Sequence, residues 1–366
     1  KRECSLKNYY SEIQIEAIHK VRALAKLQSE ASANSISEVL ASSNISPTLF
    51  YTTTQHIKEN AKVVVHFHPD KPTKTGQNVI ESLLGEGIYR NQFETGISNG
   101  GLSAFQGGER DEWEKRLFGG VYQKSEVAHF DRPKYGALDL LHYSDGASPR
   151  FGSCYFQLKQ EITNYCSFTF KDSYYEPQEL GCLEYFDTIM LSMLREIEKT
   201  GEIFGHKNLT VSSLFEQLAK KPIAQHNFSA NFGRLLDEYI EAQIHSSINL
   251  DSDVEKLVAD SSFIGTDIEN NLIQLCEKYN IRLDWHAGFY ISVHDVPDNF
   301  RGEKMPILAK RISKDENLTA VTIGCAAKNL YQNPKAWEDW GTPRECNQHL
   351  KQLWHVLVRY GKPLHS

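Results

Sequence analysis

The segment VVVHFHPD, residues 63–70, is the most informative part of this chain about its fold. Three β-branched residues precede two histidines that are two positions apart, and residues i and i+2 of a strand point to the same face. Pro69 ends the strand, because proline has no N–H to donate to a ladder. The sequence therefore predicts a buried strand with His66 and His68 side by side at its end.

A helix and a polar loop are expected directly after this strand. The segment QNVIESLL, residues 77–84, spaces its apolar residues as a helix does, and Gly85 and Gly87 close it. The chain then continues as an extended loop, IYRNQFETGISNGG at 88–101, which is rich in Gly, Ser and Asn. Imidazoles, hydroxyls and free backbone amides would meet here, as a binder of a polar, phosphate-bearing ligand requires.

Composition limits the classes of partner. The chain has 366 residues, of which 40% are hydrophobic, so it can bury a sizeable core. Its formal net charge of -7 gives no general basic surface, which argues against duplex nucleic acid or an anionic membrane as the main partner. No apolar run approaches the roughly 20 residues that span a bilayer. We expect no nucleic-acid partner and no membrane partner.

The cysteines indicate where the chain is made. There are 7, an odd number, scattered and without a CxxC pair. This pattern is typical of reduced thiols in a protein made in the cytoplasm. The chain begins with Lys1 rather than Met, so we expect a trimmed start, which leaves a removed targeting segment open.

The period of the hydrophobic pattern changes along the chain, from helical to alternating and back. We expect a helix from about Leu6 to Ser43 that breaks at 29–35, a mostly antiparallel β region at 61–172, helix again at 183–218, a strand at 238–245, a helix at 268–279, a strand pair at 281–285 and 289–293, and a helix at 337–360. The predicted class is α+β: an N-terminal helical segment at 1–60, a split antiparallel β core at 61–295 with a helical insertion at about 183–235, and a C-terminal helical extension at 296–366.

Each motif that suggests chemistry also has a structural interpretation. The two histidines of the first strand are equally typical of hydrogen-bonded structural groups. The loop at 93–101 is also explained as a turn that glycine permits. Glu241 shares a strand face with Tyr239 and Gln243, and a single strand glutamate is more often solvated than catalytic.

Five motifs give the chain a resemblance to known proteins. In order they are HFHPD (66–70), YRNQFETGISNGG (89–101), FGGVY (118–122), RPKYGAL (132–138) and PRFGSC (149–154). This series resembles an uncharacterised microbial family over roughly Lys62 to Val293. Its layout is similar in turn to the ADP-ribosyltransferase superfamily, in which a His or Arg ends the first strand, a helix and a Gly-x-Ser type strand follow, and a glutamate lies on a later strand.

The resemblance implies an NAD-dependent mono-ADP-ribosyltransferase with a split β core, NAD as co-substrate and a protein as the acceptor, of the kind that includes effectors and toxins secreted into a host cell. It implies catalytic roles for Glu241, Ser98 and His66, with Glu94 and Glu184 as substitutes for the carboxylate. The residues it assigns to NAD are His66, His68, Tyr89, Arg90, Phe93, Thr95, Gly96, Ser98, Asn99 and Tyr239. Arginine-modifying members carry Glu where this chain has Tyr239, so the resemblance does not indicate which type of acceptor side chain is modified.

Two other function classes remain. A metal-dependent hydrolase is the first, since alternate strand histidines can clasp one ion, and His245, Asp284, His286 and His294 would complete the site. Against it, the chain has no HExxH and no regular strand–helix alternation, and we expect no metal. The second is a non-enzymatic interaction protein whose helical ends bind a partner.

Overall fold

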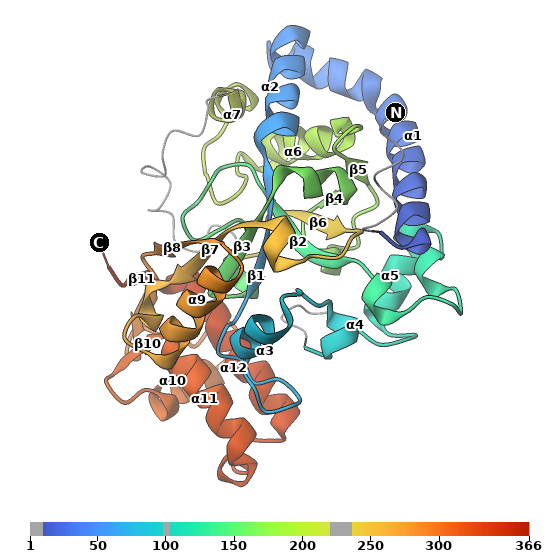
Figure 1. Cartoon of the computed structure of the whole chain (residues 1–366). Helices are drawn as coiled ribbons and strands as arrows, with labels where there is room; N and C mark the ends of the chain where they lie inside the picture. Colours follow the sequence, from blue (N-terminus) through green and yellow to red (C-terminus); the bar gives the residue numbers. More distant parts are fainter. Residues whose placement is uncertain (1–9, 98–102, 220–235, 366) are drawn as a thin grey trace.

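A large, mostly antiparallel sheet forms the centre of the protein (Figure 1). The computed structural model describes residues 10–97, 103–219 and 236–365. The strand order is β5-β4-β6-β2-β1-β3-β7-β8, and among these pairs β7 and β8 are parallel. The strands are β1 (Lys62–Phe67), β2 (Lys134–Asp139), β3 (Cys154–Leu158), β4 (Cys166–Phe170), β5 (Gly181–Cys182), β6 (Ile240–Ile244), β7 (Val254–Asp260) and β8 (Arg282–His286). The mixed α/β class with an antiparallel sheet is confirmed.

Strand β1 lies inside the sheet, between β2 and β3. Val63, Val64 and Val65 are each 0% exposed, so both faces of the strand are covered. This explains why its sequence is continuously apolar rather than alternating. Strand β2 lies between β1 and β6, and Glu241 of β6 pairs with Ala137 of β2. The end of β1 and the middle of β6 therefore belong to one part of the sheet.

The N-terminal helices lie on the outside of the sheet (Figure 1). They are α1 (Glu12–Ser42) and α2 (Pro47–Asn60), and they pack on α6 (Asp187–Thr200) and α7 (Val211–Ala219). The break expected at 29–35 is wrong, because α1 continues through it. The Ser32 hydroxyl donates to the Gln28 carbonyl, and Ser37 donates to Ala33. These polar side chains are satisfied within the helix and do not end it.

The C-terminal part combines helices with a small sheet. Its elements are α9 (Asp267–Lys278), α10 (Lys304–Ile312), α11 (Ala320–Gln332), α12 (Pro343–Tyr360) and a sheet of order β10 (Asn317–Thr319), β9 (Phe289–Ser292), β11 (Lys362–Pro363). The expected pairing of 281–285 with 289–293 is wrong: β8 joins β7 and β9 joins the small sheet. Gly288, at φ +68°, turns the chain out of the large sheet between them.

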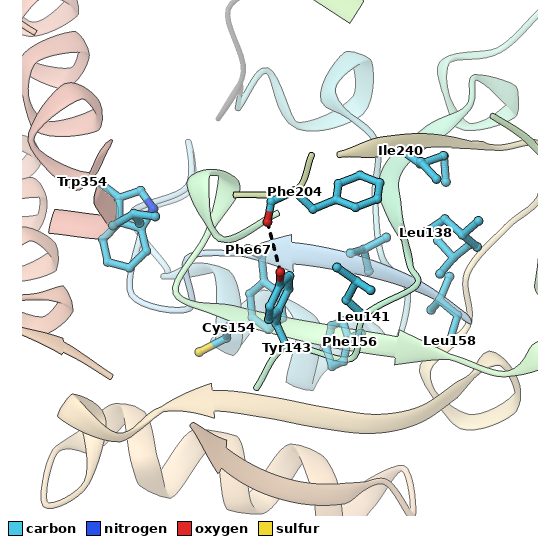
Figure 2. Close-up of a cluster of buried hydrophobic side chains, with 14 of the residues drawn as sticks. Phe67, Leu138, Leu141, Tyr143, Cys154, Phe156, Leu158, Phe204, Ile240 and Trp354 are labelled. Atoms are coloured by element: carbon cyan, nitrogen blue, oxygen red, sulfur yellow. Dashed lines mark hydrogen bonds between the residues drawn. The ribbon is translucent and has the colours of Figure 1, made fainter. Parts of the chain in front are cut away.

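Helix α12 is fixed to the large sheet near the end of β1. Figure 2 shows the buried cluster that includes Phe67, Phe156 and Trp354. The Phe67 and Phe156 rings stack with centroids 4.7 Å apart. The Trp354 indole donates to the carbonyl of Pro149, 2.9 Å away, in the turn before β3. The C-terminal helices are thereby held against the strand end that carries the two histidines.

Two further expectations concern cysteines and membranes. Six of the cysteines are free, and among them Cys325 is exposed while the other five are buried; Cys4 lies outside the described residues. In the described part of the chain, no helix has the length and apolar character needed to cross a membrane.

Candidate active site

A cavity of about 140 Å³ lies where β1 ends, beside β2 and β6. Further walls come from α3 (Val79–Glu86), α5 (Glu109–Phe118) and the segment between them. Most of the predicted site residues line it: His66, His68, Tyr89, Arg90, Thr95, Tyr239 and Glu241. Ser98 and Asn99 lie outside the described residues. The structure thus brings together segments that are up to 175 positions apart, from His66 to Glu241.

Glu241 is a buried carboxylate held by several donors. It is 3% exposed. Its Oε1 accepts from the Gln243 amide at 3.1 Å, and its Oε2 accepts from the Tyr239 hydroxyl at 3.2 Å and the Ser173 backbone N–H at 3.1 Å. The predicted shared strand face is therefore confirmed. Burial raises the pKa of Glu241, nearby Asp172 raises it further, and the Arg110 charge opposes both. This is a fixed, desolvated carboxylate and not a solvated surface residue.

Arg110 supplies positive charge to this wall of the cavity. It comes from α5 and is 4% exposed. Its guanidinium lies 4.0 Å from the centroid of the Tyr135 ring and donates to the Ser173 hydroxyl at 2.9 Å. The Nε atom of Arg110 is buried with no hydrogen-bond partner. A buried guanidinium with an unused donor is suited to binding an anionic or polar ligand group.

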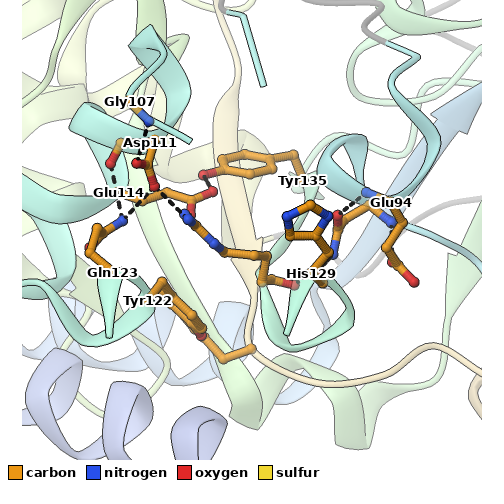
Figure 3. A network of polar contacts seen from close by, with 11 residues as sticks. Glu94, Gly107, Asp111, Glu114, Tyr122, Gln123, His129 and Tyr135 are labelled. Atoms are coloured by element: carbon orange, nitrogen blue, oxygen red, sulfur yellow. Dashed lines mark hydrogen bonds and ion pairs between the residues drawn. The ribbon is translucent and has the colours of Figure 1, made fainter. Parts of the chain in front are cut away.

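Tyr135 lines the cavity from β2, the strand between β1 and β6. Its hydroxyl donates to Glu114 at 2.9 Å, and Glu114 also accepts from Arg132 at 2.6 Å. Figure 3 shows this network, which extends to Asp111 and from there to Gln123 and the Gly107 N–H. The network fixes the tyrosine ring and the start of α5, and hence Arg110.

His66 lines the cavity, but its ring nitrogens already bond the backbone. Nε2 accepts from the Ser148 N–H at 3.2 Å, so Nδ1 carries the proton and donates to the Gly152 carbonyl at 3.1 Å. Burial lowers its pKa to about 3, so the ring is neutral. A Cβ at Gly146, where φ is +87°, would come within 2.4 Å of Nε2. The imidazole is thus an anchor between β1 and the 146–152 segment, and its ring face is what remains for a ligand.

His68 follows the end of β1 and has a different environment. Its ring meets the Trp354 ring edge-on, with centroids 5.0 Å apart. Burial lowers its pKa to about 3, with a further contribution from the Lys71 charge. Lys71 lines the same cavity, and burial lowers its pKa to about 8. The strand end therefore places a neutral imidazole and a lysine beside each other.

The glycine-rich segment is partly helical, which corrects the expected extended loop. Residues Gln92–Thr95 form α4, capped reciprocally by Asn91 and Glu94. Phe93 is 8% exposed and lies 4.2 Å under the Arg132 guanidinium, so it packs into the interior and does not line the cavity. Gly96 ends α4 at φ +65° and likewise does not line it. In contrast, the Tyr89 hydroxyl donates to the His66 carbonyl at 3.4 Å, and its side chain stays in the wall.

The three candidate carboxylates are now distinguished by position. Glu94 caps α4 and accepts from Arg90 at 3.1 Å, outside the cavity wall. Glu184 is exposed, and its backbone carbonyl accepts from Lys58. Among these three glutamates, Glu241 is the one that faces the cavity.

The histidines considered for a metal site are dispersed. His245 bonds the Tyr122 hydroxyl at 2.6 Å and the Ser167 hydroxyl at 2.9 Å. His286 bonds the Ser153 carbonyl and the Gly288 N–H, whereas Asp284 pairs with Arg282 and His294 with Glu316. Within the described ranges, no group of three or more His, Cys, Asp or Glu side chains is placed to hold a metal. The hydrolase interpretation therefore lacks a ligand set there.

The sequence analysis missed several cavity residues, among them Arg110, Tyr135 and Asp172. Tyr135 lies in the RPKYGAL motif, on a segment that was expected to be a strand, so its position was open to inference. Arg110 and Asp172 are charged residues near the ends of a helix and a strand, where sequence alone favours a solvated surface. Their burial follows from tertiary packing and has no local signal.

Comparison with known proteins places the chain in a family. A family model described as "Protein of unknown function (DUF3626)" matches residues 62–360. The chain belongs to this family. The match begins at β1 and ends in α12, so it includes the cavity and the C-terminal helices that pack beside it. A search of curated proteins finds no match.

Proposed function

We propose that this protein is an NAD-dependent mono-ADP-ribosyltransferase that releases nicotinamide and transfers ADP-ribose to a side chain of a protein acceptor. The observation that carries the proposal is Glu241: a buried carboxylate on β6, oriented by three donors and facing a cavity at the end of β1. Its place in the chain matches the order of the ADP-ribosyltransferase layout, with His66 ending the first strand, α3 following, and the glutamate on a later strand.

The residues that line the cavity support NAD as its ligand. Tyr89, Tyr135 and Phe151 offer aromatic surfaces, against which a nicotinamide ring can pack. Lys71 and Arg110 bring positive charge for phosphate groups. The resemblance assigns the middle motif of the layout to Ser98, which lies outside the described residues, so this role stays a prediction. Tyr135, on the strand between β1 and β6, lines the cavity.

The reaction follows from the electrostatics of the site. When the bond between the ribose C1′ and the nicotinamide nitrogen breaks, its electron pair leaves with nicotinamide and positive charge develops on the ribose. The preoriented Glu241 carboxylate stabilises that charge, and burial strengthens the interaction. A nucleophile of the acceptor then bonds to C1′ and loses its proton, which gives the ADP-ribosylated product. Water in place of the acceptor gives free ADP-ribose, so slow NAD hydrolysis is expected without an acceptor.

Arg110 has a definite part in this scheme. A carboxylate that is 3% exposed is held toward its neutral form by desolvation, and only the ionised form stabilises the developing charge. The Arg110 charge lowers the pKa of Glu241 and so opposes the effect of burial. Tyr239 and Gln243 donate to the same carboxylate and fix its orientation.

Nicotinamide release and metal content together test the proposal. Purified protein is incubated with NAD, released nicotinamide is measured, and zinc is determined on the same sample. We expect nicotinamide release with no stoichiometric zinc. Stoichiometric zinc without NAD turnover would contradict the transferase proposal and favour the metal-dependent hydrolase. The acceptor is then sought by incubating labelled NAD and the protein with candidate lysates.

A further inference from the structure

A second cavity, of about 50 Å³, adjoins the first. It lies between the segment after β1 and the helices α11 and α12, and His68 and Lys71 line both cavities. We call the cavity with Glu241 the catalytic chamber and the second one the helical chamber. His68 and Lys71 thus belong to the walls of both chambers, and an elongated ligand that occupied both would pass these two side chains.

The walls of the helical chamber suit a flat ring. Ile323 and Ala327 of α11 face Leu350 and Trp354 of α12 across it. Gly324 allows α11 to approach closely, because a Cβ there would lie 1.5 Å from Oδ2 of Asp70. An indole and aliphatic side chains at this spacing form an apolar slot of the type that binds heterocyclic rings.

Positive charge gathers where the two chambers meet. Lys71 and Lys351 line the helical chamber, with Asp70 as the acid among its lining residues. Arg150, Arg301 and His355 lie within electrostatic reach of Lys351 or of one another. The Nε atoms of Arg150 and Arg301 and both ring nitrogens of His355 are buried without hydrogen-bond partners. Arg150 also pairs with Asp237. A cluster of cations with unused buried N–H donors favours an anionic ligand.

We propose that the helical chamber binds the base of a nucleoside diphosphate and that Lys71 and Lys351 bind its phosphates at the junction. The part of this inference that concerns NAD rests on the proposed function: NAD would span both chambers, with nicotinamide at Glu241 and the adenine between α11 and α12. The C-terminal helices would then be part of the substrate site and not a separate extension.

Binding of ADP to the full chain tests the helical chamber without any nicotinamide chemistry. Ala327→Phe fills the chamber with a ring, whereas Lys328→Phe adds the same ring at the next, exposed position of α11. By calorimetry we expect wild type and Lys328→Phe to bind ADP equally, and Ala327→Phe to bind at least 10-fold more weakly. Equal binding by Ala327→Phe, or no binding by wild type, would overturn the proposal.

Lys71→Gln provides a second variant in case the larger residue disturbs the fold, which thermal melting will show. Removing this charge should weaken the binding of ADP by about 10-fold. Adenosine, which lacks phosphates, should bind to the variant as tightly as to wild type. Equal losses for both ligands, or none for ADP, would contradict phosphate binding at the junction.

The two proposals fail in different ways. If Ala327→Phe loses ADP binding and wild type releases no nicotinamide, the helical chamber is supported as a nucleotide site and the transferase function is contradicted. If wild type and Ala327→Phe release nicotinamide with the same KM for NAD, the transferase function is supported and the role of the helical chamber is contradicted.

Discussion

Arg110 reaches Glu241 through a single residue, Ser173. The Arg110 guanidinium donates to the Ser173 hydroxyl at 2.9 Å, and the Ser173 N–H donates to Oε2 of Glu241 at 3.1 Å. A cation from α5 is thereby fixed beside a buried acid from β6 without blocking it from the cavity. In this arrangement the Arg110 charge favours the ionised form of the carboxylate, which still lines the cavity, and the pH dependence of the reaction tests the effect.

Arg110→Gln should shift the acid limb of the pH–rate profile upward. Arg110 favours the ionised form of Glu241, so its loss raises the pKa of that carboxyl further above the ordinary value. The rate of nicotinamide release then begins to fall at a higher pH than in wild type, because the neutral acid is inactive. The profile of kcat against pH measures this. Arg116→Gln, on the exposed face of the same helix, is the control, and identical limbs in the two variants would refute the role of Arg110.

Tyr239→Phe should weaken both stability and turnover. The Tyr239 hydroxyl lies 2.8 Å from Asp172 and 3.2 Å from Glu241, so it stands between two buried acids. Its removal leaves these carboxylates with one donor fewer, and we expect a loss of about 1–3 kcal/mol in the free energy of unfolding and a fall of about 10-fold in kcat. Denaturant unfolding and nicotinamide release measure the two effects. Tyr174→Phe, at a tyrosine that is 63% exposed, should change neither.

Gly324→Ala should destabilise the protein, against the usual effect of alanine in a helix. Alanine is favoured over glycine in a helix by up to about 1 kcal/mol, but the added Cβ would lie 1.5 Å from the Asp70 carboxylate. We expect a net loss of about 1–3 kcal/mol from this overlap.

Thermal and denaturant unfolding measure that loss, with Cys325→Ala on the exposed side of α11 as control. Adding Asp70→Ala to Gly324→Ala should restore part of the stability, since it removes the atoms that overlap. A Gly324→Ala variant as stable as wild type would show that α11 does not pack on Asp70 as described.

The sequence predicted the elements whose patterns are local. The strand at 62–67 follows from a β-branched run stopped by Pro69, and the common face of Tyr239, Glu241 and Gln243 follows from strand alternation. Both features depend on neighbours within a few positions of the chain. The catalytic assignment of Glu241 itself came from the resemblance, and it stays a prediction.

The rest depends on contacts between distant segments. Arg110 and Asp172 look like surface charges in the sequence, and only the packing of α5 and of the turn after β4 against β6 buries them. The break expected in α1 is absent because contacts with a distant helix hold the segment: α1 packs on α6, and the Ser29 hydroxyl donates to Asp187 at 2.8 Å. The pairing expected between β8 and β9 failed because a helix crossover places β8 parallel to β7. None of these outcomes has a signature in the local pattern.

The most direct test of the account compares wild type with Glu241→Gln. This substitution removes the charge with little change in volume, and the Tyr239 and Ser173 donors retain an acceptor. We expect NAD affinity and melting temperature to stay near those of wild type while nicotinamide release falls by on the order of 10²-fold or more, as for other transition-state electrostatic groups. Glu184→Gln, at an exposed glutamate, should remain fully active. Full activity in Glu241→Gln would contradict the account.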